Sequence, residues 1–125
     1  MAYSYRELVA WQKARELARE IYRATDDFPA KELYGLTSQT RRAAVSVASN
    51  IAEGQGRNTK GEFHQFLGHA RGSLLELETQ LQISADLGFL NVDKFKELQL
   101  RTSEVLRVLN GLMESMKRKA AAAGE

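Results

Sequence analysis

The sequence predicts an all-α protein built as an antiparallel, up-down-up-down four-helix bundle. Apolar residues recur at spacings of three and four nearly everywhere, which is the period of an amphipathic helix. The chain has a single proline, Pro29, and few runs of β-branched residues, so a sheet is disfavoured. Short connections between the apolar stripes favour antiparallel neighbours. With 125 residues, 43% of them hydrophobic, the chain is expected to form one domain over residues 1–125.

Start and stop signals place the four predicted helices. Ser4 and Glu7 have the spacing of a capping box, Thr59 and Glu62 repeat it, and Asn91 is a further N-cap. The expected stops are Pro29, the pair Gly54 and Gly56, and Gly88. The predicted limits are about 4–26, 37–53, 59–87 and 91–119, with a frayed tail at 120–125.

The second helix has one apolar face and one unusual polar face. Opposite its apolar line lie mostly short polar groups rather than the Lys and Glu of a solvated helix. These polar-face residues are Gln39, Arg42, Ser46, Ser49, Asn50 and Glu53. Short side chains let another helix approach closely, so we predict a subunit interface here, with a solvated face as the alternative. Arg42 and Glu53 are roughly 16 Å apart along the helix, too far to pair, so each is expected to need an outside partner.

Positive charge is concentrated in the middle third of the chain. The formal net charge is only +2, yet residues 37–72 hold five basic residues against two acidic ones. The five are our candidate nucleic-acid contacts: Arg41, Arg42, Arg57, Lys60 and Arg71. For each arginine taken singly, a salt bridge or a solvated charge is the competing interpretation.

Enzymatic, metal-binding and membrane functions are disfavoured by the sequence. The chain has no cysteine, and His64 and His69 are five residues apart, so they do not share a helical face as metal ligands would. We therefore expect no metal, no cofactor and no catalytic site. With no stretch of about 20 apolar residues, no membrane association is expected and a cytoplasmic location is predicted. Five aromatic residues are predicted to be core rather than base-stacking platforms: Trp11, Tyr22, Tyr34, Phe63 and Phe66.

Several runs of residues together carry a family resemblance. They include Leu8-x-x-Trp11-Gln12-x-Ala14, Glu32-x-Tyr34-Gly35-Leu36-Thr37-x-Gln39, Asn50-Ile51-Ala52-Glu53-Gly54-x-Gly56-Arg57 and Ala70-x-Gly72-Ser73-x-x-Glu76. In these runs the chain resembles the four-helix bacterial proteins encoded in intervening sequences of 23S ribosomal RNA genes. That family is in turn similar to the accessory variability proteins of diversity-generating retroelements, which work with a reverse transcriptase and nucleic acid. Ala48 departs from the pattern, because many relatives are expected to carry proline there, and it leaves the helix without a proline kink.

The resemblance implies a ring-shaped homopentamer without established enzymatic activity. A ring would repeat each basic residue, and a protomer charge of +2 becomes about +10 in a pentamer. Our first hypothesis is therefore a non-enzymatic homo-oligomer that binds structured RNA or an RNA–DNA hybrid. The alternative is a protein–protein assembly adaptor with no nucleic-acid role, for which a reverse transcriptase is one conceivable partner.

Overall fold

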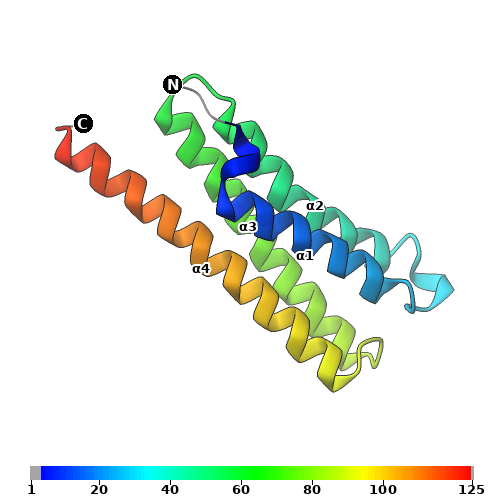
Figure 1. Ribbon diagram of the computed structural model, residues 1–125. Coiled ribbons are helices and arrows are strands. Elements are labelled where there is room, and N and C mark those ends of the chain that lie inside the picture. The colour runs from blue at the N-terminus through cyan, green and yellow to red at the C-terminus, as the bar shows by residue number, and fades with distance from the viewer. Residues whose placement is uncertain (1–3, 125) are drawn as a thin grey trace.

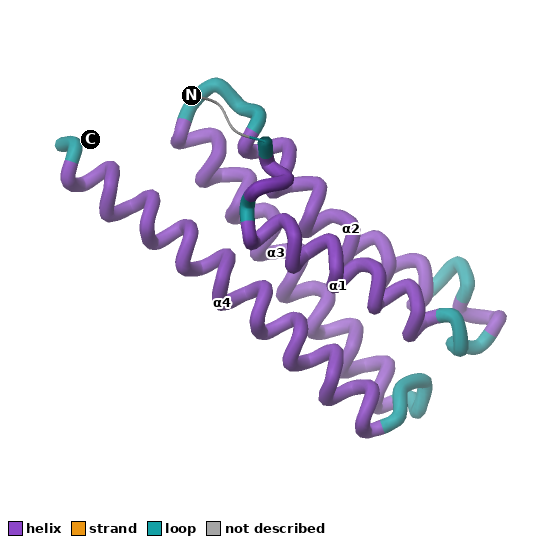
Figure 2. Tube along the Cα trace, viewed as in Figure 1, coloured by secondary structure: helices purple, strands orange, loops and turns teal. Residues whose placement is uncertain are grey.

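The structure, a computed structural model, describes residues 4–124 as four long α-helices and two short 3-10 turns. The elements in chain order are η1 (Tyr5–Glu7), α1 (Val9–Thr25), η2 (Ala30–Glu32), α2 (Leu36–Gln55), α3 (Lys60–Asp86) and α4 (Val92–Ala122). Figure 1 shows each long helix running back alongside its predecessor, and Figure 2 shows the loops gathered at the two ends. Residues 4–124 contain no strand, so the predicted all-α class with four helices is confirmed.

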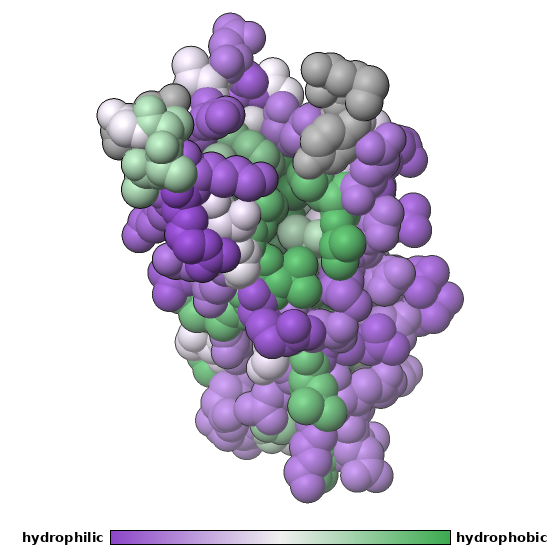
Figure 3. Space-filling view, turned by 60° about the vertical axis from the view of Figure 1, so that its left-hand side comes forward, coloured by the Kyte–Doolittle hydropathy of each residue, from purple (hydrophilic) through white to green (hydrophobic). Residues whose placement is uncertain are grey.

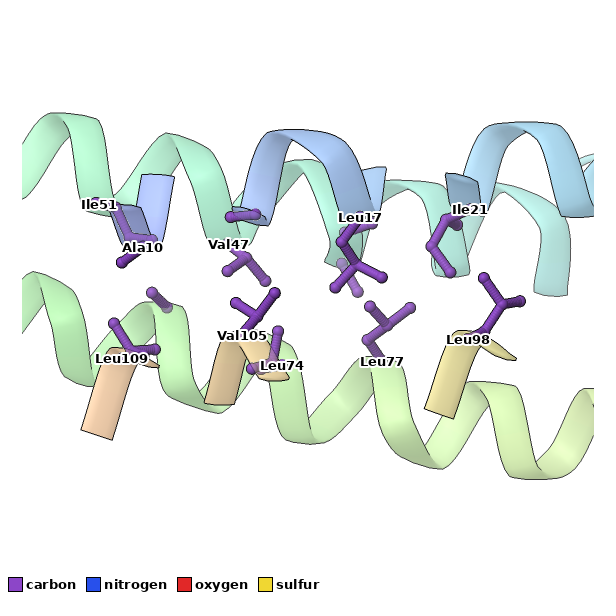
Figure 4. Packing of buried hydrophobic residues seen from close by; sticks show 14 of the residues in the cluster. Ala10, Leu17, Ile21, Val47, Ile51, Leu74, Leu77, Leu98, Val105 and Leu109 are labelled. Carbon is purple, nitrogen blue, oxygen red and sulfur yellow. The ribbon is translucent and has the colours of Figure 1, made fainter. Parts of the chain in front are cut away.

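A single cluster of buried apolar side chains lines the interior of the bundle. Figure 4 shows side chains converging from different helices, including Ile21 of α1, Val47 of α2 and Leu98 of α4. Two fully buried threonines lie within the bundle, Thr40 on α2 and Thr102 on α4. The hydroxyls of Thr40 and Thr102 each donate to the carbonyl four residues earlier, at 2.7 Å. These polar groups therefore enter the core without an unpaired donor.

Three predicted boundary residues set the helix ends as expected. The Glu62 N–H donates to Thr59 Oγ1 at 3.1 Å, which caps α3, and the Lys94 N–H donates to Asn91 Oδ1 at 2.8 Å, which caps α4. Gly88 follows α3 with a φ of 79°, a left-handed conformation that glycine adopts without steric cost. The antiparallel α3–α4 hairpin is thus encoded locally.

The first helix begins later than the capping pattern predicted. Ser4 Oγ accepts from the Arg6 N–H at 3.1 Å, so Ser4 caps the short turn η1, and Glu7 takes no part in a capping box. Leu8 is extended, with a ψ of 125°, and α1 starts only at Val9. The extended backbone places the Leu8 side chain in the core, where it is 8% exposed. Burial of this one leucine overrides the local helix-start signal.

Of the glycine pair predicted to stop the second helix, Gly56 has that role and Gly54 does not. Helix α2 continues to Gln55, and Gly54 is a buried residue within it. A Cβ atom on Gly54 would lie 2.6 Å from Phe66 Cβ and 3.1 Å from Phe63 Cδ1. Gly54 therefore allows α2 and α3 to approach closely, which is a packing role rather than a conformational one. Gly56 is the C-cap, with an ordinary helical φ of −82°.

The tail that was expected to fray from residue 120 is helical as far as Ala122. Alanine has the highest helix propensity, which favours continuation of the helix through the alanine run. Lys119, in the last turn, also suits the negative end of the helix dipole. Glu125 lies outside the described residues.

Candidate assembly and nucleic-acid surfaces

The polar face of α2 is divided between an internal contact and an exposed strip. Ser46 Oγ lies 2.9 Å from Ser73 Oγ of α3, and Asn50 Nδ2 donates to the Ser46 carbonyl at 2.8 Å. A close helix approach therefore exists at Ser46, where the neighbour is α3 of the same chain, whereas the Asn50 amide bonds within α2. Both side chains are only half-buried, so their place in a subunit interface remains a prediction. The short serine side chains at this contact allow α2 and α3 to approach each other closely.

The remaining polar-face residues and the exposed Val45 form a line on the surface, which we call the α2 strip. Its members are Gln39, Arg42, Val45, Ser49 and Glu53. Glu53 does not need an outside partner, because Arg57 donates to its carboxylate at 2.8 Å one turn later. Arg42 has no ion pair within residues 4–124. The α2 strip is thus exposed on the protomer, and its one cation, Arg42, has no acidic partner within residues 4–124.

A hollow of about 580 Å³ adjoins the α2 strip, and we call it the tyrosine hollow. Its principal residues are Tyr22, Leu33, Tyr34, Arg41, Arg42 and Val45. Tyr34 is 92% exposed, Leu33 51% and Tyr22 44%. The prediction that Tyr22 and Tyr34 belong to the core is wrong. Contiguous exposed apolar surface of this kind is a mark of a binding or assembly site.

The connection between α1 and α2 explains why Tyr34 points outward. Glu32 Oε1 accepts from the Leu36 N–H at 3.1 Å and so satisfies a free donor at the start of α2. The intervening residues Leu33 and Tyr34 are therefore carried in a turn rather than on a helical stripe. Leu33 and Tyr34 lie between Pro29 and Gly35, and this position favours a turn. The helical spacing of Tyr34 with other aromatic residues led instead to the prediction that it is buried.

Arg41 is a structural residue of the α1–α2 contact. Its Nε donates to Thr25 Oγ1 at 2.8 Å, and its Nη2 donates to Asp26 Oδ1 at 3.0 Å and to the Tyr22 carbonyl at 3.3 Å. The guanidinium also lies over the Tyr22 ring, 4.6 Å from its centroid. With its donors directed at α1, Arg41 is poorly placed to contact phosphate.

The other four candidate cations are not gathered in one patch. Arg57 lies over the Phe66 ring at 4.6 Å and pairs with Glu53. Arg71 is exposed on α3, and Lys60 lines a separate groove between α3 and α4. Neither has an ion pair within the part of the chain that the structure describes. Arg57, Lys60 and Arg71 thus lie along the α2–α3 turn and the first half of α3.

The two histidines do not converge on a common point. His69 packs edge-on against Phe66, with the ring centroids 5.6 Å apart, whereas His64 lines the groove beside Lys60. Residues 4–124 contain no group of three or more His, Cys, Asp or Glu side chains arranged to hold a metal ion. Nor does any helix in that range have the length and apolar character to cross a membrane.

Comparison with known proteins establishes the family. The pattern that describes the 23S rRNA-intervening sequence protein family matches residues 6–111. The chain belongs to this family. A crystal structure of a protein of unknown function from the S23 ribosomal protein family of Bacteroides thetaiotaomicron is similar, with a TM-score of 0.76 and 18% identity, over 84% of this chain and 98% of that one. No curated protein matches the chain.

Membership of the 23S rRNA-intervening sequence protein family confirms the predicted resemblance and agrees with the four-helix fold. At 18% identity the Bacteroides structure supports the fold alone. The family match ends at Gly111, so the last turns of α4, including Lys117 and Lys119, lie beyond it.

Proposed function

We propose that this protein is a non-enzymatic, homo-oligomeric scaffold that binds structured RNA or an RNA–DNA hybrid. The observation that carries the proposal is the exposure of Tyr22, Leu33, Tyr34 and Val45 around one hollow. Burying such a patch in a subunit contact removes apolar surface from water, which stabilises the contact by about 25 cal/mol per Å² of apolar surface. Self-association is the use of this surface that the family resemblance favours.

The tyrosine hollow and the α2 strip form a continuous assembly surface, because Arg42 and Val45 belong to both. Ser49, in the middle of the strip, leaves room for an approaching helix. A closed ring joins two different surfaces of each subunit, so this surface would meet another face of the next copy. Five copies is the number that the resemblance implies.

Ser49→Arg is expected to convert the oligomer to smaller species. A long charged side chain in the centre of the assembly surface would separate the two helices and bury an unpaired charge. The measurement is molar mass by light scattering coupled to size-exclusion chromatography. Ser103→Arg is the matched control, because Ser103 is an exposed serine on α4, away from the strip. An oligomer mass unchanged by Ser49→Arg would remove the assembly surface from the proposal.

Nucleic-acid contact is assigned to Arg57 and Arg71, and Lys60 is left out because it lines a separate groove between α3 and α4. Arg57 is held in place by Glu53 and the Phe66 ring, while Arg71 is exposed. Repetition around a pentamer would multiply these charges and give phosphate binding a marked dependence on salt. Arg41 is left out because its donors serve α1, and Arg42 is assigned to assembly because it lines the tyrosine hollow.

The double substitution Arg57→Gln/Arg71→Gln is expected to weaken binding of structured RNA on the order of tenfold and to make its salt dependence shallower. Affinity is measured by mobility shift at several salt concentrations, with the oligomer mass checked in parallel. Lys31→Gln/Lys96→Gln removes the same charge from exposed sites away from this surface. Wild-type binding that occurs only at very low salt and without preference for structure would favour the adaptor function instead.

A further inference from the structure

An apolar groove rimmed by lysines lies between the first turns of α3 and the last turns of α4, and we call it the α3–α4 groove. Its volume is about 540 Å³. Its floor is apolar and consists of Phe63, Leu112 and Met116. Its rim is basic and consists of Lys60, Lys117 and Lys119. Figure 3 shows an apolar hollow bordered by hydrophilic residues at the end of the molecule where α4 finishes.

The groove exists because α1 is much shorter than α4. The ion pair between Lys13 and Glu104 shows which positions of the two helices lie side by side. From that pair α1 extends only to Val9, whereas α4 runs in the same direction to Ala122. The difference is roughly 20 Å of helix at 1.5 Å per residue. Within residues 4–124 only the short turn η1 precedes α1, so the last turns of α4 lack the α1 neighbour that its earlier turns have.

The chemistry of the groove calls for a ligand with two properties. Phe63, Leu112 and Met116 are only partly buried and pack against the core cluster, so their outer surfaces need an apolar cover. None of the three rim lysines has an ion pair within the described residues. A nucleic acid backbone would neutralise the lysines but leave the apolar floor in water. A helix with apolar and acidic residues satisfies both requirements.

We propose that the α3–α4 groove docks an amphipathic helix of a partner protein, whose apolar face is flanked by carboxylates. The helix would occupy the place that further turns of α1 would have filled, and its residues at i, i+3, i+4 and i+7 would cover the floor. Carboxylates at the flanks would pair with the rim lysines. Met116 helps the floor to fit the side chains of the docked helix, because the unbranched thioether side chain adjusts to irregular surfaces. The proposal is independent of assembly through the tyrosine hollow and of RNA binding by Arg57 and Arg71.

Two fluorescein-labelled synthetic peptides test the proposal by fluorescence anisotropy. Both carry leucine at i, i+3, i+4 and i+7, and the flanking positions are glutamate in one and lysine in the other. The glutamate peptide is expected to bind the wild-type protein on the order of tenfold more tightly than the lysine peptide, with the difference shrinking as salt rises. Lys117→Glu/Lys119→Glu should reverse this preference, because both lysines are exposed and the fold does not depend on them.

The apolar floor is tested by Met116→Asp, with Leu100→Asp as its control on the same helix. Leu100 is 72% exposed and lies outside the groove. Met116→Asp should weaken binding of the glutamate peptide on the order of tenfold, and Leu100→Asp should leave the affinity for this peptide unchanged. Failure of the wild type to bind either peptide, or equal binding by the lysine-reversed variant, would overturn the proposal. A fall in oligomer mass on Met116→Asp would also overturn the proposal, because it would show that a second copy of the protein occupies the groove. Displacement of the peptide by RNA would overturn it as well, because RNA would then be the ligand of the groove.

Discussion

Gly54→Ala is expected to lower the free energy of unfolding by about 2 kcal/mol, even though alanine is the better helix former. The added methyl group would lie 2.6 Å from Phe66 Cβ and 3.3 Å from the Phe63 carbonyl oxygen. Neither atom is the end of a flexible side chain, so α2 and α3 must move apart. The same contact includes the Ser46–Ser73 hydrogen bond, which separation of the helices would lengthen.

Gly68→Ala is the matched control and should have the opposite sign. Gly68 lies within α3, is exposed, and has no atom within 4 Å of the Cβ that it would gain. Alanine there should raise the free energy of unfolding by about 0.5–1 kcal/mol, because glycine in a helix is entropically unfavourable. Urea denaturation of the two variants and the wild type measures both changes. Destabilisation of equal size at the two glycines would contradict the close-approach explanation for Gly54.

Helix boundaries were predictable from sequence where the deciding group is local. Thr59, Asn91 and Gly88 act through hydrogen bonds or backbone conformation within a few residues, and each has its predicted role. Prediction failed where a distant contact decides. Leu8 is extended because the core takes its side chain, and Gly54 is helical because Phe66 packs on it. A glycine that ends a helix and a glycine that admits a neighbour look the same in a sequence.

The candidate surfaces were less predictable than the fold, for a related reason. The angular position of Ser46 and Ser49 on α2 was correct, but periodicity does not say which neighbouring element each side of a helix will meet. Ser46 meets Ser73 of α3, and Ser49 remains exposed. Tyr34 was misplaced because a loop residue can fall on a helical spacing by chance. The α3–α4 groove depends on the unequal lengths of two helices whose ends were predicted only approximately.

Arg41→Gln is expected to lower the free energy of unfolding by about 2 kcal/mol, whereas Arg42→Gln should change it by less than about 0.5 kcal/mol. Glutamine at Arg41 cannot maintain the bonds to Thr25, the Tyr22 carbonyl and Asp26 together. It also loses the cation–π contact with the Tyr22 ring. Thr25 is 2% exposed, so its hydroxyl would lose a partner that water cannot easily replace.

Denaturation of the two variants under conditions that keep the protein monomeric gives the comparison, because assembly would otherwise add its own free energy. The side chain of Arg41 is 22% exposed and directed at α1, whereas Arg42 is exposed beside it without an ion pair within residues 4–124. Equal stability of the two variants would mean that the α1–α2 contact does not depend on the guanidinium. The predicted difference also decides how RNA binding is tested. Weaker RNA binding after substitution of Arg41 would therefore reflect a loosened α1–α2 contact rather than a lost phosphate contact.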